Sequence, residues 1–160
     1  MPDLLWVDDD GPHRFKYEEV VLREDHGWQI TWSRSIEGAI DALATRRFDA
    51  IVLDQMLPLA DDSAAAGYWG GYALLHWLKG CKEPTPQPPP EHARRFVGKT
   101  PHPGNAEARV CIVSAFEDLT VQKAIRTVCP QIAIFPKPLE LERLEEFLAA
   151  QEPERARDTP

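Results

Sequence analysis

One short apolar run that ends in an aspartate constrains the fold of this chain more than any other feature. Residues 50–53 read AIVL, a composition typical of a strand buried on both faces of a parallel sheet. Asp54 follows at once, and Pro58 prevents the strand from continuing. A carboxylate at the end of a buried strand is costly to ionise unless another group neutralises it. The sequence therefore predicts a partner for Asp54 elsewhere in the chain.

Three other apolar runs also end in polar or charged side chains. They are residues 4–10 (LLWVDDD), which end in three carboxylates, residues 110–114 (VCIVS), which end in a hydroxyl, and residues 132–138 (IAIFPKP), which end in a lysine between two prolines. In an open α/β sheet, ligands bind outside the carboxyl ends of the strands. We therefore expect the acids, the hydroxyl and the lysine to converge on one edge of the sheet.

The segments between these runs have the apolar spacing of helices. We predict strands over 3–7, 28–32, 50–53, 109–113 and 132–135, and helices over 13–26, 35–46, 72–79, 117–128 and 139–150. Strands that alternate with helices indicate parallel βαβ units with right-handed crossovers. Five such units match a flavodoxin-like (βα)5 sandwich of three layers with a parallel five-stranded sheet. The strand order 2-1-3-4-5 is taken from known members of that fold and does not follow from the pattern itself.

The order of the strand-end groups resembles that of response regulator receiver domains in two-component signalling. An Asp-Asp pair, a central Asp, a Ser and a Lys-Pro pair follow one another at successive strand ends, over roughly residues 3–150. The resemblance implies that Asp54 is a phosphoacceptor. It would take a phosphoryl group from a phosphohistidine on a sensor histidine kinase or phosphotransfer protein and form an aspartyl phosphate.

The resemblance also implies a magnesium site, since oxygen ligands with room for water suit Mg²⁺. Asp9 and Asp54 would bind the ion directly, together with the backbone carbonyl of Met56, and Asp8 would act through a metal-bound water. We expect Asp10 only to cap the first helix.

Further site residues follow from the same resemblance. Ser114 and Lys137 would stabilise the phosphoryl group and take part in the switch. The small Ala115 would leave access to that group, and the bond from Lys137 to Pro138 is expected to be cis. Receivers usually carry an aromatic residue at the position of Ile134, and the chain departs from the family there, so the resemblance does not extend to the coupling between that aromatic and the hydroxyl.

Two segments, about 59–70 and 81–108, are longer than the corresponding connections of receivers. The first lies next to Asp54 in the sequence, and we hypothesise that it covers this carboxylate and slows loss of the phosphoryl group. The second contains seven prolines and is expected to be a solvated surface loop, partly polyproline-like. The receiver domain would span residues 1–150, and the polar residues 151–160 would form a frayed tail.

Composition excludes several classes of protein. The chain has 18 basic and 26 acidic residues and a net charge of −8, which argues against a nucleic-acid-binding surface. No apolar run approaches the length of about 20 residues that a membrane helix needs. Its three cysteines lack CxxC spacing, and no signal peptide precedes the first strand, so a cytoplasmic protein with reduced thiols is expected.

Three functional interpretations are open at this point. The first is a stand-alone phosphoacceptor that catalyses only its own phosphorylation and dephosphorylation and switches the binding of a downstream protein, with a homodimer as an option that the family resemblance raises. The second is a receiver-like interaction module that works without phosphorylation. The third is a small Mg²⁺-dependent phosphohydrolase, which would need a general acid two residues after the nucleophile, where Met56 cannot serve.

Overall fold

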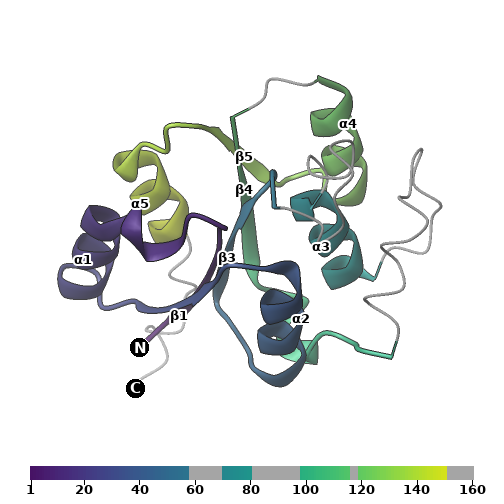
Figure 1. Ribbon diagram of the computed structural model, residues 1–160, viewed down its shortest axis with the longest axis horizontal. Helices are drawn as coiled ribbons and strands as arrows, with labels where there is room; N and C mark the ends of the chain where they lie inside the picture. Colours follow the sequence, from purple (N-terminus) through teal and green to yellow (C-terminus); the bar gives the residue numbers. More distant parts are fainter. Residues whose placement is uncertain (58–69, 81–97, 116–118, 151–160) are drawn as a thin grey trace, which may run out of the picture.

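The computed structural model describes residues 1–57, 70–80, 98–115 and 119–150, and these residues form one parallel sheet with helices on both faces (Figure 1). The strands are β1 (Asp3–Val7), β2 (Gln29–Ser33), β3 (Ala50–Asp54), β4 (Arg109–Ser114) and β5 (Ala133–Pro136). They pair in the order β2-β1-β3-β4-β5. The predicted flavodoxin-like fold and strand order are therefore confirmed.

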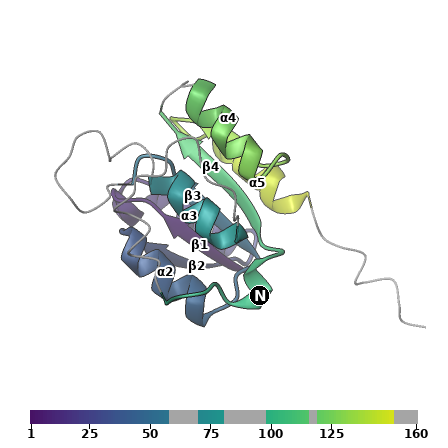
Figure 2. The ribbon, with the colours of Figure 1, turned by 90° about the vertical axis from the view of Figure 1, so that its right-hand side faces the viewer.

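The helices divide into two layers, as Figures 1 and 2 show. They are α1 (Lys16–Glu24), α2 (Ile36–Thr45), α3 (Gly70–Lys79), α4 (Leu119–Val128) and α5 (Leu141–Ala149), with short 3₁₀ turns η1 (Gly11–His13) and η3 (Pro103–Asn105). One apolar core lies between the sheet and α2, α3 and α4, and the other lies between the sheet and α1 and α5. Strand β3 contributes to both cores and is buried throughout, as its composition predicts.

The first helix begins later than the sequence indicates. We expected it over residues 13–26, whereas η1 ends at His13 and α1 starts only at Lys16. Between them, Phe15 has non-helical backbone angles (φ −111°, ψ 30°) and is almost fully buried. Its ring lies 4.8 Å from that of Trp6, centroid to centroid. Packing of this ring into the core interrupts the helix that the polar pattern alone would start earlier.

Local signals place the ends of the next elements correctly. Gly27 follows α1 with φ +68°, the left-handed conformation that glycine adopts without a Cβ penalty. Ser35 precedes α2, and its hydroxyl accepts a hydrogen bond from the Gly38 N–H at 3.1 Å. The other predicted elements agree with the observed ones to within about two residues in the described part of the chain.

The end of the second inserted segment is partly packed against the domain. Residues 98–100 are exposed, as expected for a solvated loop, but the expectation is wrong for Asn105 and Ala108, which are buried. Asn105 is fully buried there. Its side chain donates to the carbonyls of Leu43 and Arg46, each at 2.8 Å, and accepts from the Phe48 N–H at 2.7 Å. One side chain thus satisfies the backbone where α2 turns into β3. The polyproline-like part of this insertion, residues 84–90, lies outside the described residues.

Neighbouring contacts tie the same segment to α3. The Trp77 indole N–H donates to the Lys99 carbonyl at 3.0 Å, and the Lys79 ammonium donates to the Ala106 carbonyl at 3.2 Å. The Lys99 ammonium pairs with Asp41 on α2. Residues 99–106 therefore form a strap across the ends of α2 and α3, which we call the 99–106 strap.

Two observations concern the class of protein. Among the helices in the described ranges, none is long and apolar enough to cross a membrane. Cys111 and Cys129 are free thiols, and burial raises the pKa of the Cys111 thiol. Cys111 is thus an unreactive core side chain, whereas Cys81 lies outside the described residues.

We predict that Asn105→Ala lowers the free energy of unfolding by about 2–3 kcal/mol, because it leaves buried backbone groups without partners. Chemical denaturation followed by circular dichroism measures the change. The exposed Gln131→Ala removes an amide elsewhere and is expected to shift stability by less than about 0.5 kcal/mol. Equal effects of the two variants would contradict the role assigned to the 99–106 strap.

Candidate functional site

The partner that the sequence demands for Asp54 is Lys137. The Lys137 ammonium lies 3.1 Å from the Asp54 carboxylate and 3.7 Å from the Asp8 carboxylate. Both carboxylates are buried, with side chains 2% exposed, and the lysine side chain is only 11% exposed. Three groups from β1, β3 and the residue after β5 therefore meet at the carboxyl edge of the sheet.

The strand register brings these groups together. Asp54 stands opposite Val113 across the β3–β4 pair, and Ser114 stands opposite Pro136 across the β4–β5 pair. The Lys137 N–H then donates to the Ser114 carbonyl at 3.0 Å, which continues the ladder by one residue. Since all strands are parallel, their last residues share one edge, and the predicted convergence of Asp8, Asp54, Ser114 and Lys137 on it is observed.

Backbone hydrogen bonds orient the two buried carboxylates. One oxygen of Asp54 accepts from the Met56 N–H at 3.0 Å, and one oxygen of Asp8 accepts from the Asp10 N–H at 2.9 Å. The other oxygen of each carboxylate faces Lys137. These contacts hold the side chains with one oxygen toward the lysine and one toward a loop N–H.

Burial shifts the titration of both acids. Desolvation raises the pKa of Asp54, and the Met56 N–H and Lys137 oppose this effect only in part. Desolvation also raises the pKa of Asp8, and repulsion from the Asp54 carboxylate adds to it. One lysine therefore does not compensate two buried carboxylates, so an additional cation would be favourable at this edge.

The donor set suits a hard cation. The carboxylate oxygens of Asp8, Asp9 and Asp10 lie within 4.8 Å of one another. The Asp54 carboxylate is close enough to raise the pKa of Asp8 by repulsion. All these donors are oxygen, the ligand type that Mg²⁺ prefers. The residues present thus fit the magnesium ion that the family resemblance implies.

Asp10 does not have the capping role that we expected. Its side chain makes no cap hydrogen bond to the turn that it precedes. Instead, its carboxylate pairs with the Arg14 guanidinium at 2.5 Å, one helical turn further along the chain. The charged guanidinium attracts this carboxylate more strongly than a neutral backbone N–H would, and the cap is lost.

The remaining predicted residues lie where the sequence puts them. Ser114 is buried at the end of β4, and Ala115 beside it is exposed. The bond between Lys137 and Pro138 is cis, as expected. Ile134 packs on the side of α2, α3 and α4, while Phe135 packs on the side of α5 against Phe147, with ring centroids 5.9 Å apart. The side where receivers usually carry their aromatic thus holds an isoleucine.

Two glycines at the start of α3 are site residues whose role the sequence did not reveal. A Cβ on Gly71 would lie 2.6 Å from the Asp54 carbonyl, and a Cβ on Gly70 would lie 2.3 Å from the Leu57 carbonyl. The helix backbone therefore touches the end of β3 directly. A Gly-Gly pair at a helix start is the signal that could have indicated this close approach. Residues 58–69 lie outside the described residues, so the covering role of this insertion stays a prediction.

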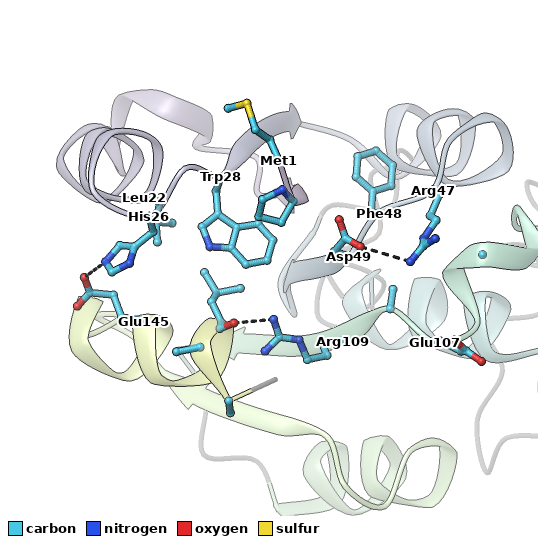
Figure 3. Close-up of a pocket in the computed structure, with 16 residues that line it drawn as sticks. Met1, Leu22, His26, Trp28, Arg47, Phe48, Asp49, Glu107, Arg109 and Glu145 are labelled. Atoms are coloured by element: carbon cyan, nitrogen blue, oxygen red, sulfur yellow. Dashed lines mark hydrogen bonds and ion pairs between the residues drawn. The ribbon is translucent and has the colours of Figure 1, made fainter. Parts of the chain in front are cut away.

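A separate pocket opens at the opposite end of the sheet (Figure 3). It has a volume of about 1180 Å³, and residues at the amino ends of the strands line it. Five of its titratable side chains have partners: His26 pairs with Glu145 at 2.8 Å, Arg47 with Asp49 at 3.5 Å, and Arg109 with backbone carbonyls at the end of α5. Because these pairs satisfy one another, we place the chemistry at Asp54 and not in this pocket.

Comparison with known proteins supports the fold. Solved structures that resemble the chain include a receiver domain protein from Methanospirillum hungatei (TM-score 0.61, 16% identity, covering 92% of this chain and 90% of that one). A two-component response regulator from Clostridium difficile is similar (TM-score 0.60, 17% identity, 94% of each chain). The chain has the fold of response regulator receiver domains.

A third similar structure is the receiver domain of a sensor histidine kinase from Pseudomonas aeruginosa, described with a magnesium ion coordinated in its active-site cleft (TM-score 0.60, 17% identity, 92% of this chain and 93% of that one). No protein-family model and no curated protein matched by sequence. Likeness at such low identity defines the receiver fold, and the function must be argued from the site.

The raised pKa values give a stability prediction. An acid whose pKa is higher in the folded state stabilises the fold in its protonated form. This contribution is fully present below the pKa of the unfolded state, about 3.9, and is lost as the pH rises through the pKa of the folded state. We therefore expect Asp8→Asn to raise the melting temperature at pH 7 by a few degrees, and this gain to shrink as the pH falls toward about 4.

Differential scanning calorimetry across this pH range makes the measurement. The exposed Asp25→Asn, at the residue that follows α1, is the matched control and is expected to leave the melting temperature nearly unchanged. A lower melting temperature for Asp8→Asn at pH 7 would show that the buried carboxylate stabilises the fold in its ionised form, contrary to this account.

Proposed function

We propose that this protein is a phosphoacceptor receiver of a two-component phosphorelay, with Asp54 as the acceptor. One observation carries the proposal: Lys137 lies between the buried carboxylates of Asp54 and Asp8, at 3.1 and 3.7 Å, on the ligand-binding edge of a receiver fold. A lysine so placed can neutralise charge that arrives on Asp54. Stability of the fold alone gives no reason to bury two acids around one base.

The chemistry is transfer of a phosphoryl group from the phosphohistidine of a kinase or phosphotransfer protein. An Asp54 oxygen attacks phosphorus, a P–O bond forms, and the P–N bond breaks, with the electron pair leaving on the imidazole nitrogen. Lys137 stabilises the charge on the phosphoryl oxygens, and Ser114 contributes a hydroxyl from the neighbouring strand end. The Met56 N–H holds the carboxylate in place.

A magnesium ion belongs to the proposal. Asp9 and Asp54, with the Met56 carbonyl, would hold it directly, and Asp8 through a water. When bound, the ion supplies positive charge that offsets the phosphoryl oxygens. Asp8 also serves without the ion, because it fixes one side of Lys137.

The phosphoryl group would act as a switch. It adds a charge of about −1.5 to −2 beside Asp8. The response is carried by Ser114 and the face of α4 and β5, and it changes the affinity for a downstream protein, or for a second copy of the chain. In this proposal the protein works in the cytoplasm and acts on no other substrate, and neither nucleic acid nor membrane is a partner.

One observation favours a second candidate function. The 99–106 strap adds a fixed surface across the ends of α2 and α3, which could bind a partner whether or not Asp54 is phosphorylated. The protein would then be an interaction module. The two functions differ in whether the chain takes up a phosphoryl group at all.

Intact-mass spectrometry after incubation with Mg²⁺ and acetyl phosphate tests the proposal. We expect the wild type to gain one phosphoryl group and Asp54→Asn to gain none, because the nucleophile is lost. The exposed Asp41→Asn on α2 is the matched control and should gain the group as the wild type does. If the wild type gains no mass while binding Mg²⁺, the interaction-module function is favoured instead.

A further inference from the structure

Two arginines flank the loop that carries the three consecutive aspartates. Arg14 lies just before α1, and its guanidinium pairs with the Asp10 carboxylate at 2.5 Å. The guanidinium carbon also lies 5.8 Å from the centre of the Phe15 ring. Since Phe15 is packed into the core, these two contacts hold the arginine beside Asp10. Asp10 is the exposed member of the acidic cluster, and we call its position the mouth of the acidic site.

The second arginine supports the loop from the neighbouring connection. The Arg34 side chain, from the turn between β2 and α2, donates to the Asp9 carbonyl at 3.2 Å. It also lies over Gly11, where an added Cβ would be 3.2 Å from the arginine chain. Arg34 thus holds the loop by packing and a backbone hydrogen bond, whereas Arg14 contacts a carboxylate of the acidic cluster.

Arg14 retains capacity for a ligand. A guanidinium has five N–H donors, and within the described ranges Asp10 is the group to which Arg14 hydrogen-bonds. The side chain is 48% exposed, so its remaining donors face water. Its charge also interacts with the buried site: the pKa of Arg14 is raised mainly by its hydrogen bond to Asp10, with smaller effects from Asp8 and Asp54.

The acidic site creates a problem that this arginine can solve. The phosphoryl group of any donor is an anion, and it must approach a pocket that holds Asp8, Asp9 and Asp54 against one lysine. Asp10 would add a fourth negative charge at the mouth if it were not paired. A cation at the mouth lowers the repulsion along the path of approach while the carboxylates stay ionised.

We propose that Arg14, held by Asp10 at the mouth of the acidic site, binds the phosphoryl group of the incoming donor and so determines how fast Asp54 is phosphorylated. This proposal rests on the proposed function of Asp54 as the acceptor. It assigns to Arg14 a ligand of defined chemistry, a phosphoryl group that carries negative charge, whether on a small acyl phosphate or on a phosphohistidine.

Phosphorylation kinetics of full-length variants test the role. With acetyl phosphate as donor at saturating Mg²⁺, we expect Arg14→Ala to lower the second-order rate constant roughly threefold to tenfold, and Arg14→Lys to keep most of the rate because it keeps the charge. The loss should shrink as ionic strength rises. Monophosphoimidazole serves as a second donor that mimics phosphohistidine; a loss with both donors supports recognition of the shared phosphoryl group, and a loss with neither overturns it.

Helix α1, which follows Arg14, offers a matched control. Arg23 pairs with Glu19 at 2.9 Å with the same spacing, but it also donates to the Ile30 carbonyl near the start of β2, away from Asp54. The Arg23→Ala variant should therefore be phosphorylated at the wild-type rate. If Arg23→Ala slows the reaction as much as Arg14→Ala, the effect comes from α1 and the proposal is wrong.

Magnesium affinity separates this proposal from a structural role and from failure of the proposed function. Removing a positive charge beside the acids should tighten Mg²⁺ binding by Arg14→Ala about twofold or more, whereas damage to the loop would weaken it. If the wild type takes up no phosphoryl group, Asp54 is not an acceptor. The Mg²⁺ affinity of Arg14→Ala then tests by itself whether Arg14 lies beside the acidic cluster. An unchanged or weaker Mg²⁺ affinity of Arg14→Ala would then overturn its assigned place at the mouth.

Discussion

The contact of Lys137 with two buried carboxylates is the interaction on which the candidate site depends. Asp8, Asp54 and Lys137 each come from a different strand end, and each would be costly to bury alone. Together they still leave one negative charge in excess when both acids are ionised. Burial raises the pKa of both acids, and repulsion from Asp54 adds to this effect at Asp8. Lys137 therefore offsets part of the charge of the two acids, and the remaining negative charge favours an additional cation. In the proposed function, that cation would also offset the charge of the phosphoryl group.

The rest of the structure keeps this edge of the sheet in place. Five parallel strands deliver the acids, the hydroxyl and the lysine to one edge, and β3 lies between both apolar cores (Figure 1). The 99–106 strap secures the opposite end, where buried Asn105 satisfies backbone groups between α2 and β3. The described end of this longer connection is thus packed into the domain, at the end of the sheet away from Asp54.

The fold and the site follow from sequence to different extents. Short apolar runs that end in Asp54, Ser114 or Lys137 are local signals, so the strands and their common edge could be predicted. Asn105 could not, because its partners lie 57 to 62 residues away and no local pattern records them. The start of α1 and the role of Asp10 were predicted wrongly, since a buried ring and a nearby arginine outweighed the local preferences of the chain.

The site also shows how a receiver fold can differ in detail around shared chemistry. Ile134 stands where an aromatic is usual, and an arginine at the mouth balances a third aspartate.

The most direct test of the central claim is to locate the phosphoryl group itself. Borohydride reduces an aspartyl phosphate to homoserine, and peptide mass spectrometry then identifies the position. Our account predicts homoserine at position 54 alone; modification at another aspartate, or at none, would contradict it.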